Sequence, residues 1–394
     1  MARICVVRAF FVPDDVRVRR EINALADAGH RVTVVCMRSP GSVRRERYGD
    51  VEIHRLPMTH RRGGILRYAF EYLAFPLLAA LYLGLLDLRR RFDLVQVNTI
   101  PDWLVFAAAG PRLRGVPVIV DLHELMPEFF ASKFGTTLRH PGVRALARLE
   151  QASIRFADLA MTCTEEMRNA FVSRGADADR ISVVMNSSEE AIFDPQTFPP
   201  RRDRQTGRFS LICHGTIEER YGLDTIIRAL RRLDDQIPGL TLEIYGEGTY
   251  QHELRGMVEE FGLADRVSFN GFVPVDQLVA AIADADAGVV AMKRDAFRDL
   301  TQCNKMFDLI TMRRPVICSR TTSVMASFPD DCLQYFDADD DADLARAIEE
   351  VFAQPHLGPQ LVERAEEQNP AYRWLRQRER YLALVDQALA GRQS

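Results

Sequence analysis

The stretch FDPQTFPPRRDRQTGRF, residues 193–209, separates two regions of the chain that share one pattern. It contains three prolines and four arginines. On both sides of it, short β-branched runs alternate with segments whose apolar residues recur at helical spacing. This alternation indicates parallel strands connected by helices, because a parallel connection needs a long crossover. We therefore predict two doubly wound α/β domains joined at this proline-rich stretch.

The expected strands are short apolar runs. Those before the joint lie at residues 2–9, 31–37, 94–98, 116–122, 159–164 and 181–186, and those after it at 209–215, 240–246, 266–272, 287–292 and 314–319. A helix is expected at 16–29, stopping at Gly29. Ligands of such sheets bind outside the carboxyl ends of the strands, so the expected site is the cleft between the two domains.

The composition is that of a globular protein. A chain of 394 residues and 44.7 kDa is long enough for two domains of ordinary size. The net charge of −4 argues against a dedicated nucleic-acid binder. Residues 1–190 carry 27 Lys+Arg against 22 Asp+Glu, whereas the remaining residues carry 24 against 33. The first half is therefore the half suited to an anionic partner.

The seven cysteines are scattered and never spaced as CxxC. Several lie inside apolar runs, which is typical of small buried side chains in a reducing compartment. The opening residues MARICVVRAF lack the apolar core and cleavage site of a signal peptide. A cytoplasmic location is expected.

Three turns place a glycine directly after an apolar run, where the backbone must turn or approach a ligand closely. They are CHGT at 213–216, YGEG at 245–248 and FNGF at 269–272. None is a GxGxxG sequence, so the dinucleotide fingerprint of a dehydrogenase is absent from them.

The segment LAFPLLAALYLGLLDL, residues 73–88, is the most apolar in the chain. It is short for a membrane span and contains a proline. Two interpretations stay open: a helix in the core of the first domain, or a helix that lies on an anionic membrane surface. The arginines that flank it are Arg61, Arg62, Arg67, Arg89, Arg90 and Arg91.

Lysine is rare in this chain. Lys133, Lys293 and Lys305 are three lysines among 51 basic residues. Lys305 stands in NKMFDLITM, which is expected to be helical and to lead into the strand at 314–319. A lysine amid arginines marks either a need for a compact ammonium or chance.

Taken in order, these segments resemble a family 4 glycosyltransferase of the GT-B fold, over essentially the whole chain. The first helix and second strand, the segment FDLVQVNTIPDWLVFAA at 92–108 and VIVDLHELMPEF at 118–129 correspond to its first domain. The loop ICHGTIEERYGLDTIIRAL at 212–230 resembles its donor-phosphate loop, and NKMFDLITMRRPVICS at 304–319 closes the donor domain. Each piece is weak alone, but their order is specific.

The resemblance implies a domain plan. Two Rossmann-like sheets would face each other across a cleft, with an acceptor-side domain at 1–190 and a linker at 191–207. A donor-binding domain would follow at 208–370. A terminal helix at 371–394 would return to the first domain.

The resemblance also implies a reaction. A hexose-type sugar would pass from a nucleoside-diphosphate donor to a hydroxyl or similar acceptor, with the anomeric configuration retained. The nucleotide sugar is a substrate, and neither a metal nor another cofactor is expected. The acceptor stays open between lipid-linked, cell-envelope and small-molecule compounds, with a peripheral contact to the inner face of the membrane as a possibility.

The donor's diphosphate gains negative charge as the glycosidic bond breaks, so fixed positive groups should supply much of the rate. A glycine-led loop before a helix offers backbone N–H groups. Within the resemblance, Gly215, Thr216, Arg220 and Lys305 are the phosphate-binding residues. Asp308 stands where the family has a glutamate that receives the ribose hydroxyls.

The remaining site residues also come from the resemblance. His123 follows a strand that ends near Asp121, where the family has a histidine close to the transferred sugar. Glu124 beside it is the second candidate for catalysis, and Glu128 is weighed with it. Backbone near Phe272 and Val273 is expected to hold the base.

Several positions depart from the family pattern. Thr216 and Tyr221 replace an arginine and a lysine of the donor loop, and Leu300 replaces the first acid of a paired-acid motif. Arg220 is the substitute proposed for the missing cation, and Asp299, Asp295 or backbone N–H groups for the missing acid. The segment FFVPDDVR replaces a Gly-Gly loop after the first strand.

Two other functions on this fold stay open: a nucleotide-sugar epimerase and a nonenzymatic nucleotide-sugar-binding scaffold. Asp-x-Asp pairs such as Asp284/Asp286 are the kind of motif that carries a divalent ion in the other major glycosyltransferase fold. They lie in Ala/Asp-rich stretches where chance produces them, so no metal site is expected.

Overall fold

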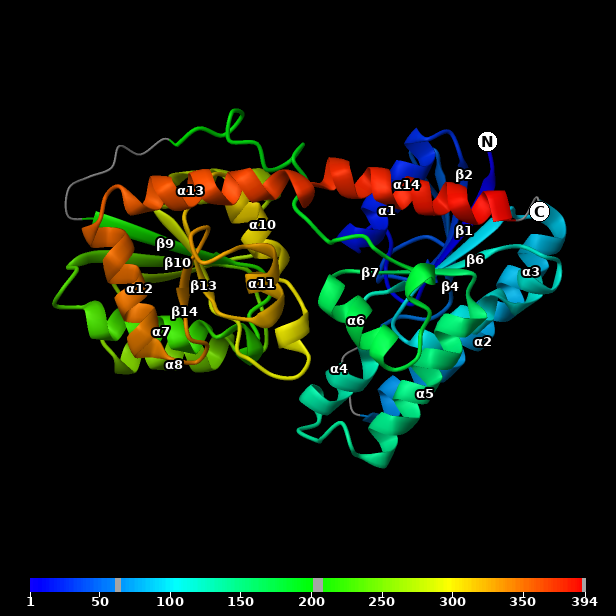
Figure 1. The fold of residues 1–394 in the computed structure, drawn as a ribbon, viewed down its shortest axis with the longest axis horizontal. Helices are drawn as coiled ribbons and strands as arrows, with labels where there is room; N and C mark the ends of the chain where they lie inside the picture. The colour runs from blue at the N-terminus through cyan, green and yellow to red at the C-terminus, as the bar shows by residue number, and fades with distance from the viewer. Residues whose placement is uncertain (61–64, 201–207, 392–394) are drawn as a thin grey trace. The chain divides into compact units, whose positions relative to one another are not determined.

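A computed structural model describes residues 1–60, 65–200 and 208–391 of the protein. The chain divides into two compact units (Figure 1). Unit 1 comprises Met1–Met185 and Gln377–Ser394, and unit 2 comprises Asn186–Arg376. Arg61 and Arg62, two of the arginines that flank the apolar segment, lie outside the described residues.

Unit 1 is built on an eight-stranded sheet of order β3-β4-β2-β1-β5-β6-β7-β8. Every neighbouring pair is parallel except β3 with β4. The strands are β1 (Arg3–Arg8), β2 (Arg31–Met37), β3 (Arg45–Tyr48), β4 (Val51–Leu56), β5 (Leu94–Asn98), β6 (Val118–Leu122), β7 (Leu159–Thr162) and β8 (Ile181–Val183).

Helices cover both faces of this sheet, as the doubly wound pattern predicts (Figure 1). They are α1 (Val16–Asp27), α2 (Ile65–Arg90), η1 (Asp102–Ala108), α3 (Ala109–Leu113), α4 (Met126–Lys133), α5 (Pro141–Phe156), α6 (Glu165–Ser173), η2 (Ala178–Arg180) and α14 (Trp374–Gly391). Helix α14 is part of this unit from Gln377 onward, because the Tyr381 hydroxyl donates to Gln96 Oε1 on β5 at 2.7 Å.

Unit 2 is built on a six-stranded parallel sheet of order β11-β10-β9-β12-β13-β14. The strands are β9 (Arg208–His214), β10 (Gly239–Tyr245), β11 (Val267–Gly271), β12 (Ala287–Val290), β13 (Val316–Ser319) and β14 (Gln334–Phe336). The order reverses beside β9, so the carboxyl ends of β9 and β12 flank a topological switch point, where ligands of such sheets bind.

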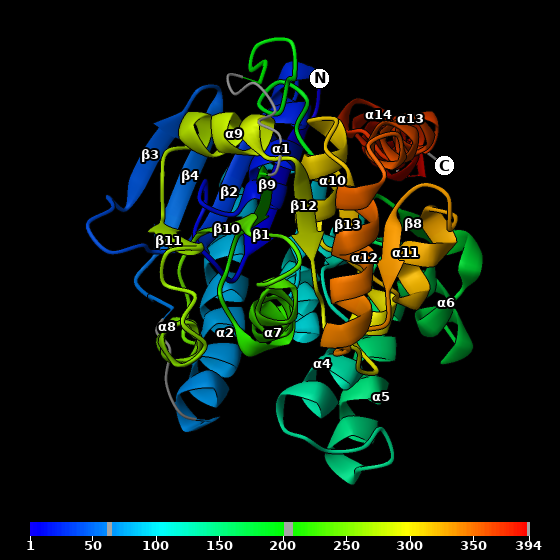
Figure 2. The same cartoon turned by 90° about the vertical axis from the view of Figure 1, so that its left-hand side faces the viewer.

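Helices also lie on both faces of the second sheet. Figure 2 shows α7 and α12 on one face and α9 and α10 on the other. The helical elements are η3 (Glu219–Tyr221), α7 (Leu223–Leu233), α8 (Gln251–Glu260), α9 (Val275–Asp284), η4 (Arg298–Leu300), α10 (Asn304–Thr311), α11 (Thr322–Ser327), α12 (Asp341–Ala353), α13 (Leu357–Gln368) and η5 (Asn369–Ala371).

The two parallel sheets confirm the predicted fold class, and each expected strand overlaps an observed one. Three further strands were not predicted: β3, β4 and β14. Strand β4 was missed because His54 and Arg55 stand in the middle of it. Both side chains are buried, and hydrogen-bond partners compensate for their burial. His54 Nδ1 lies 2.7 Å from the Tyr82 hydroxyl, and Arg55 donates to the carbonyl oxygens of Val12 and Val43.

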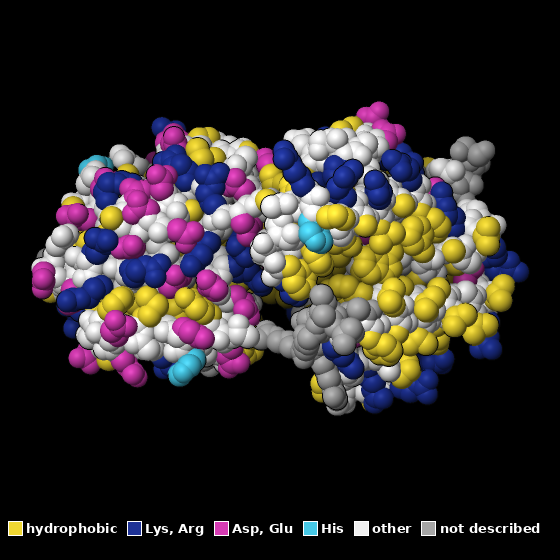
Figure 3. Space-filling view, turned by 90° about the horizontal axis from the view of Figure 1, so that it is seen from below, with side chains coloured by type: hydrophobic (Ala, Val, Ile, Leu, Met, Phe, Trp, Pro, Cys, Tyr) yellow, Lys and Arg dark blue, Asp and Glu magenta, His cyan; other side chains and the backbone are white. Residues whose placement is uncertain are grey.

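The apolar segment 73–88 lies inside α2, which continues through Pro76. One face of this helix is buried, with Phe75, Ala79 and Leu83 fully covered. The other face is exposed, and Figure 3 shows a broad hydrophobic area on unit 1. The core interpretation therefore describes one face of α2, and the other face departs from it.

Candidate functional site

Each sheet has a polar cluster at the carboxyl ends of its strands. In unit 1 the cluster forms around His123, the residue that follows β6. His123 Nε2 lies 2.8 Å from Asp121 Oδ2, and the His123 backbone N–H donates to Thr99 Oγ1 at 3.2 Å. Because a carboxylate only accepts, Nε2 of His123 carries the proton and Nδ1 is left as an acceptor.

A buried arginine completes the cluster. Arg17 on α1 donates from Nε to Asp121 Oδ2 at 2.9 Å and to Glu21 Oε1 at 3.2 Å. Gln96 and Asn98 on β5 donate to Glu21 Oε2 at 2.8 and 2.7 Å. A buried charge persists only when it is paired and hydrogen-bonded, and this network meets that condition.

The electrostatics of the cluster follow from its burial. Burial and then the neighbouring Asp121 raise the pKa of Glu21 to about 8. Burial alone would raise the pKa of Asp121, but Arg17 and His123 together hold it below its ordinary value. Burial, aided by the charges of Arg8 and Arg17, lowers the pKa of His123 despite Asp121. His123 is therefore neutral near pH 7 and offers a hydrogen-bonding imidazole rather than a cation.

The two glutamates weighed with His123 differ in their surroundings. Glu128, near the start of α4, is buried and accepts from Arg174 Nη1 at 2.7 Å. Arg174 also holds Glu150 through Nε and Nη2, at 2.8 and 2.9 Å. Glu128 is thus part of a structural ion-pair network. Glu124 is half-buried in the turn between β6 and α4 and stays a prediction.

In unit 2, backbone hydrogen bonds join the turns that follow β9, β10 and β11. The Gly215 N–H donates to Tyr245 O at 2.8 Å, and the Gly246 N–H donates to Gly271 O at 2.7 Å. A Cβ on Gly246 would lie 2.0 Å from Gly215 O, so only glycine permits this approach. All three glycine turns singled out in the sequence therefore meet at one edge of the sheet.

Helix α10 is placed beside these turns by close packing. A Cβ on Gly288 of β12 would lie 2.2 Å from Leu309 Cδ1, so the helix rests directly on the strand. Met306, Phe307, Leu309 and Ile310 are all buried. This packing fixes the first turn of α10, which carries Lys305, and the next turn, which carries Asp308.

Lys305 lies directly over the turn at Gly215. A Cβ on Gly215 would lie 2.4 Å from Lys305 Cε, and Gly215 has a φ of +102°. The Lys305 ammonium lies 4.0 Å from the centroid of the Tyr221 ring, and the Arg220 guanidinium lies 5.2 Å from the same centroid. The structure therefore brings Gly215, Lys305 and Arg220 together around an aromatic ring, although Tyr221 was predicted only as a replacement for a lysine.

Asp308 has a partner that sequence reasoning missed. Its Oδ2 lies 3.2 Å from His214 Nε2, at the end of β9. Among the described residues it forms this contact and no i,i+3 ion pair with Lys305. The Asp308 side chain is 15% exposed, so it can still accept a hydrogen bond from outside. His214 and Asp308 are 94 positions apart in the sequence, which explains why no local pattern revealed the pair.

Arg298, on η4, was also missed. Its side chain is 18% exposed and its Nη1 lies 2.5 Å from Asp295 Oδ2. Burial lowers the pKa of Arg298, and the charge of Arg220 acts in the same direction. Arg298 therefore adds a cation near Arg220, where anion binding would relieve the mutual repulsion.

The acids proposed to replace the one missing at Leu300 are already engaged. Asp295 also accepts from the Arg298 N–H at 2.7 Å, and Asp299 accepts from Arg294 Nη2 at 2.6 Å and the Thr322 N–H at 3.1 Å. Both shape the loop that carries η4, which is the role the structure supports for them.

The remaining predicted residues lie at the same edge of the sheet. Thr216 is exposed in the donor loop. Phe272 follows β11 and is 86% exposed, which is unusual for a large aromatic side chain. Val273 beside it is half-buried. An exposed ring at this position is suited to stacking on a flat ligand.

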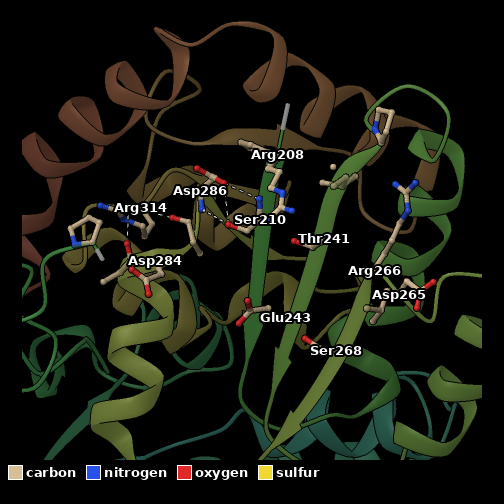
Figure 4. A pocket seen from close by; sticks show the side chains of 18 of the residues that line it. Arg208, Ser210, Thr241, Glu243, Asp265, Arg266, Ser268, Asp284, Asp286 and Arg314 are labelled. Atoms are coloured by element: carbon tan, nitrogen blue, oxygen red, sulfur yellow. Dashed lines mark hydrogen bonds between the residues drawn. The ribbon is translucent and has the colours of Figure 1, made fainter. Parts of the chain in front are cut away.

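A separate hollow of unit 2 lies at the opposite edge of the sheet. Figure 4 shows Arg208, Ser210, Thr241 and Ser268 lining it, near the amino ends of their strands. Asp286 there accepts from the Ser210 N–H at 2.8 Å and its hydroxyl at 3.0 Å. These groups satisfy one another, and ligands of parallel sheets bind at the carboxyl ends, so the hollow is not the candidate site.

The described residues contain no group of three or more His, Cys, Asp or Glu side chains that could hold a metal ion. The positive groups around Tyr221 are instead Lys305, Arg220 and Arg298. The arrangement can bind an anion at the start of α10 and a hydroxyl at Asp308.

Comparison with known proteins agrees with this geometry. Residues 15–187 match the glycosyl transferase 4-like domain, and residues 208–354 match glycosyl transferases group 1. The 2-deoxystreptamine glucosyltransferase of Streptomyces kanamyceticus is 28% identical over 291 residues, which are 69% of this chain and 73% of that protein.

Solved structures share the fold. Sucrose-phosphate synthase from Thermosynechococcus elongatus has a TM-score of 0.79 at 18% identity, covering 99% of this chain and all of that one. Anabaena HepE in complex with UDP-glucose has a TM-score of 0.71 at 14% identity, covering 98% and 100%. The chain therefore joins a glycosyl transferase 4-like domain to a glycosyl transferases group 1 domain, in the GT-B fold of the glycosyltransferases.

Proposed function

We propose that the protein transfers a hexose-type sugar from a nucleoside-diphosphate sugar to a hydroxyl acceptor, with retention of the anomeric configuration. The observation that carries this proposal is the placement of Lys305 over Gly215, one helical turn before Asp308. A single short helix thereby presents an ammonium and a carboxylate beside a glycine loop. That set of groups suits a diphosphate joined to a ribose.

The donor is assigned to unit 2 on this basis. Lys305, Arg220 and Arg298 supply positive charge to the diphosphate, and the loop at Gly215 and Thr216 supplies backbone N–H groups. Asp308, held by His214, accepts from a ribose hydroxyl. The Phe272 ring stacks on the base, with backbone at Val273 beside it. The UDP-glucose in the HepE complex supports this class of donor.

The chemical step needs charge to be stabilised on the leaving group. As the new bond forms between the acceptor oxygen and the anomeric carbon, the bond to the diphosphate breaks and its negative charge grows. The fixed cations of unit 2 stabilise that charge without a metal ion. His123 is assigned to the transferred sugar as a neutral imidazole, and Glu124 to a sugar or acceptor hydroxyl.

A cytoplasmic location belongs to the same proposal. All seven cysteines are free, and five of them are buried. Burial raises the pKa of the Cys213 thiol and raises that of Cys36 to about 12, so these thiols are unreactive small side chains. That usage is typical of a reducing compartment.

The test combines calorimetry with product analysis. We expect UDP or GDP to bind the wild-type protein, and a matching nucleotide sugar to give a glycoside whose anomeric proton coupling shows retention. Nucleotide binding without transfer to any of the three acceptor classes would favour the scaffold. An isomerised nucleotide sugar formed without acceptor would favour the epimerase, and an inverted product would overturn the retaining mechanism.

A further inference from the structure

The exposed face of α2 is uniformly apolar. Between residues 70 and 88, every exposed position is a phenylalanine or a leucine. Their exposed fractions run from 37% to 69%, and the residues are Phe70, Leu73, Leu77, Leu78, Leu81, Leu85 and Leu88. At a rise of about 1.5 Å per residue, this row is about 27 Å long. Soluble proteins rarely leave a row of this kind uncovered.

The helix is nevertheless part of unit 1 and is tied to it by polar contacts. Its only two charged residues between 70 and 88 are Glu71 and Asp87, and both are buried. His60 Nδ1 lies 2.9 Å from Glu71 Oε2, and Asp87 accepts from Arg114 Nε at 2.7 Å. Trp103 Nε1 donates to Tyr72 O at 2.8 Å.

These contacts decide between two membrane geometries. By length and composition, Phe70–Arg90 could cross a membrane. Crossing would separate Glu71 from His60 and Asp87 from Arg114, and would expose the face that packs on the sheet. Each buried carboxylate would then lose its partner outside the helix. A helix that keeps one face on its domain can only lie along a bilayer surface.

The charge around this face shows which partner fits. The short helix η1 packs against both α2 and α5, so a single element separates these two helices. Residues 131–149, which lead into and form most of α5, contain four exposed cations and no Asp or Glu. Within the described part of the chain, Arg139, Arg144 and Arg148 have no acidic partner. Figure 3 shows Lys and Arg side chains around the hydrophobic area.

A second copy of the chain fits less well. A two-fold interface places the same patch of both copies together, so the cations of α5 would meet one another. An anionic bilayer instead offers hydrocarbon to the leucine row and phosphate to the arginines. Phe134 and Leu138, 46% and 45% exposed in the same basic stretch, would enter the interface with them.

We propose that α2 and the basic stretch 131–149 form a peripheral docking face for an anionic membrane. The leucine row would lie in the headgroup boundary, and the arginines would bind lipid phosphates. Resting on the proposed transferase function, this face selects an acceptor whose hydroxyl stands at the bilayer surface, that is, a lipid-linked acceptor.

Vesicle flotation of the full chain tests the docking face. Wild-type protein should float with phosphatidylcholine vesicles that contain phosphatidylglycerol, and at least tenfold less with phosphatidylcholine alone. Leu77→Glu/Leu81→Glu/Leu85→Glu should abolish flotation. The matched control is Leu375→Glu, a leucine 67% exposed in unit 2, which should float like wild type. Arg139→Gln/Arg144→Gln/Arg148→Gln should lose the preference for anionic vesicles.

Several outcomes would overturn the proposal. Wild-type protein that does not float with either vesicle type rules it out, as does a leucine-row variant that floats like wild type. A concentration-dependent dimer in ultracentrifugation that the leucine-row variant loses would assign the face to a second copy. UDP and GDP binding, measured on the same variants, reports separately on the transferase proposal and on folding. Loss of nucleotide binding with flotation intact would reject the transferase function alone.

Discussion

Each unit of this protein pairs a histidine with an aspartate at the carboxyl end of its sheet, but the two pairs have different surroundings. In unit 1, Asp121 is fully buried and shared between His123 and Arg17. In unit 2, Asp308 is 15% exposed and meets His214, with Lys305 one turn away. The first pair is held by a closed network, whereas the second keeps hydrogen-bonding capacity for a ligand. Similar residues at similar places therefore differ in how many hydrogen bonds the fold already satisfies.

The largest expected effect separates the two aspartates by stability. Asp121→Ala leaves the buried Arg17, Asn98 and His123 without their carboxylate, and breaking a buried pair costs about 3–5 kcal/mol. Asp308→Ala should cost at most about 1 kcal/mol, because its pair is partly solvated. Urea unfolding of both variants measures this difference. An equal decrease in the free energy of unfolding in both variants would mean that the two pairs stabilise the protein equally.

Lys305→Ala should separate binding from stability within unit 2. Removing one preorganised donor to a developing anion typically costs about 2.7–4 kcal/mol, or 10²–10³-fold in turnover. The free energy of unfolding should change by no more than about 0.5 kcal/mol, because the ammonium lies at the surface of the site. Transfer rates and nucleotide affinity measure the effect. Lys133→Ala is the control of equal charge for nucleotide affinity, and a loss of affinity as large there would remove the assignment.

Gly215, which lies beside Lys305, and Gly246, which lies beside Gly215, sharpen the same point. Gly215→Ala strains a φ of +102°, at about 1–3 kcal/mol, and its Cβ would push Lys305 aside. We expect nucleotide affinity to fall about tenfold, equivalent to 1.4 kcal/mol. Gly246→Ala meets the backbone oxygen of Gly215 instead, so it should cost more stability than Gly215→Ala. Thermal unfolding and calorimetry of the pair check the order, and its reversal would contradict the packing described for these turns.

The smallest effect is the pH response of His123. Burial is the main reason that the pKa of His123 is lowered in the folded protein. In the unfolded chain this histidine has its ordinary pKa of about 6.5, so below that pH it binds a proton more readily than in the folded protein. His123 therefore contributes stability above that pH, and this contribution is lost as the pH falls through the window between the two pKa values. Unfolding of His123→Asn between pH 5 and 8 should show a shallower decline than wild type. An unchanged slope would mean that other groups cause the decline.

Much of this arrangement was predictable from local patterns. The apolar strands and the helix at Lys305 follow from spacing and turn residues, and the meeting of three glycine turns follows from parallel topology. The missed features are tertiary. His214 is in an apolar strand, and nothing local shows that it faces Asp308. Arg17 and Glu21 resemble the solvated side of an amphipathic helix, because only the fold reveals that β5 and β6 present polar side chains to them.

The arginines near α2 show the same limit. Arg89, Arg90 and Arg91 look equivalent in the sequence. In the structure, Arg90 binds Glu52 through two nitrogens at 2.6 and 2.8 Å, whereas Arg89 and Arg91 are exposed. Three adjacent arginines thus have different surroundings, because only Arg90 reaches an acid on the neighbouring strand. That strand is β4, which was not predicted.

The placement of α14 has a consequence for biosynthesis. Gln377 Oε1 accepts from the Met185 N–H at 2.8 Å, and Tyr381 reaches Gln96, so residues near position 380 close a unit that begins at Met1. All of unit 2 is translated between these two parts. The part of the first sheet that contacts Tyr381 therefore stays uncovered on the nascent chain until this last helix emerges from the ribosome.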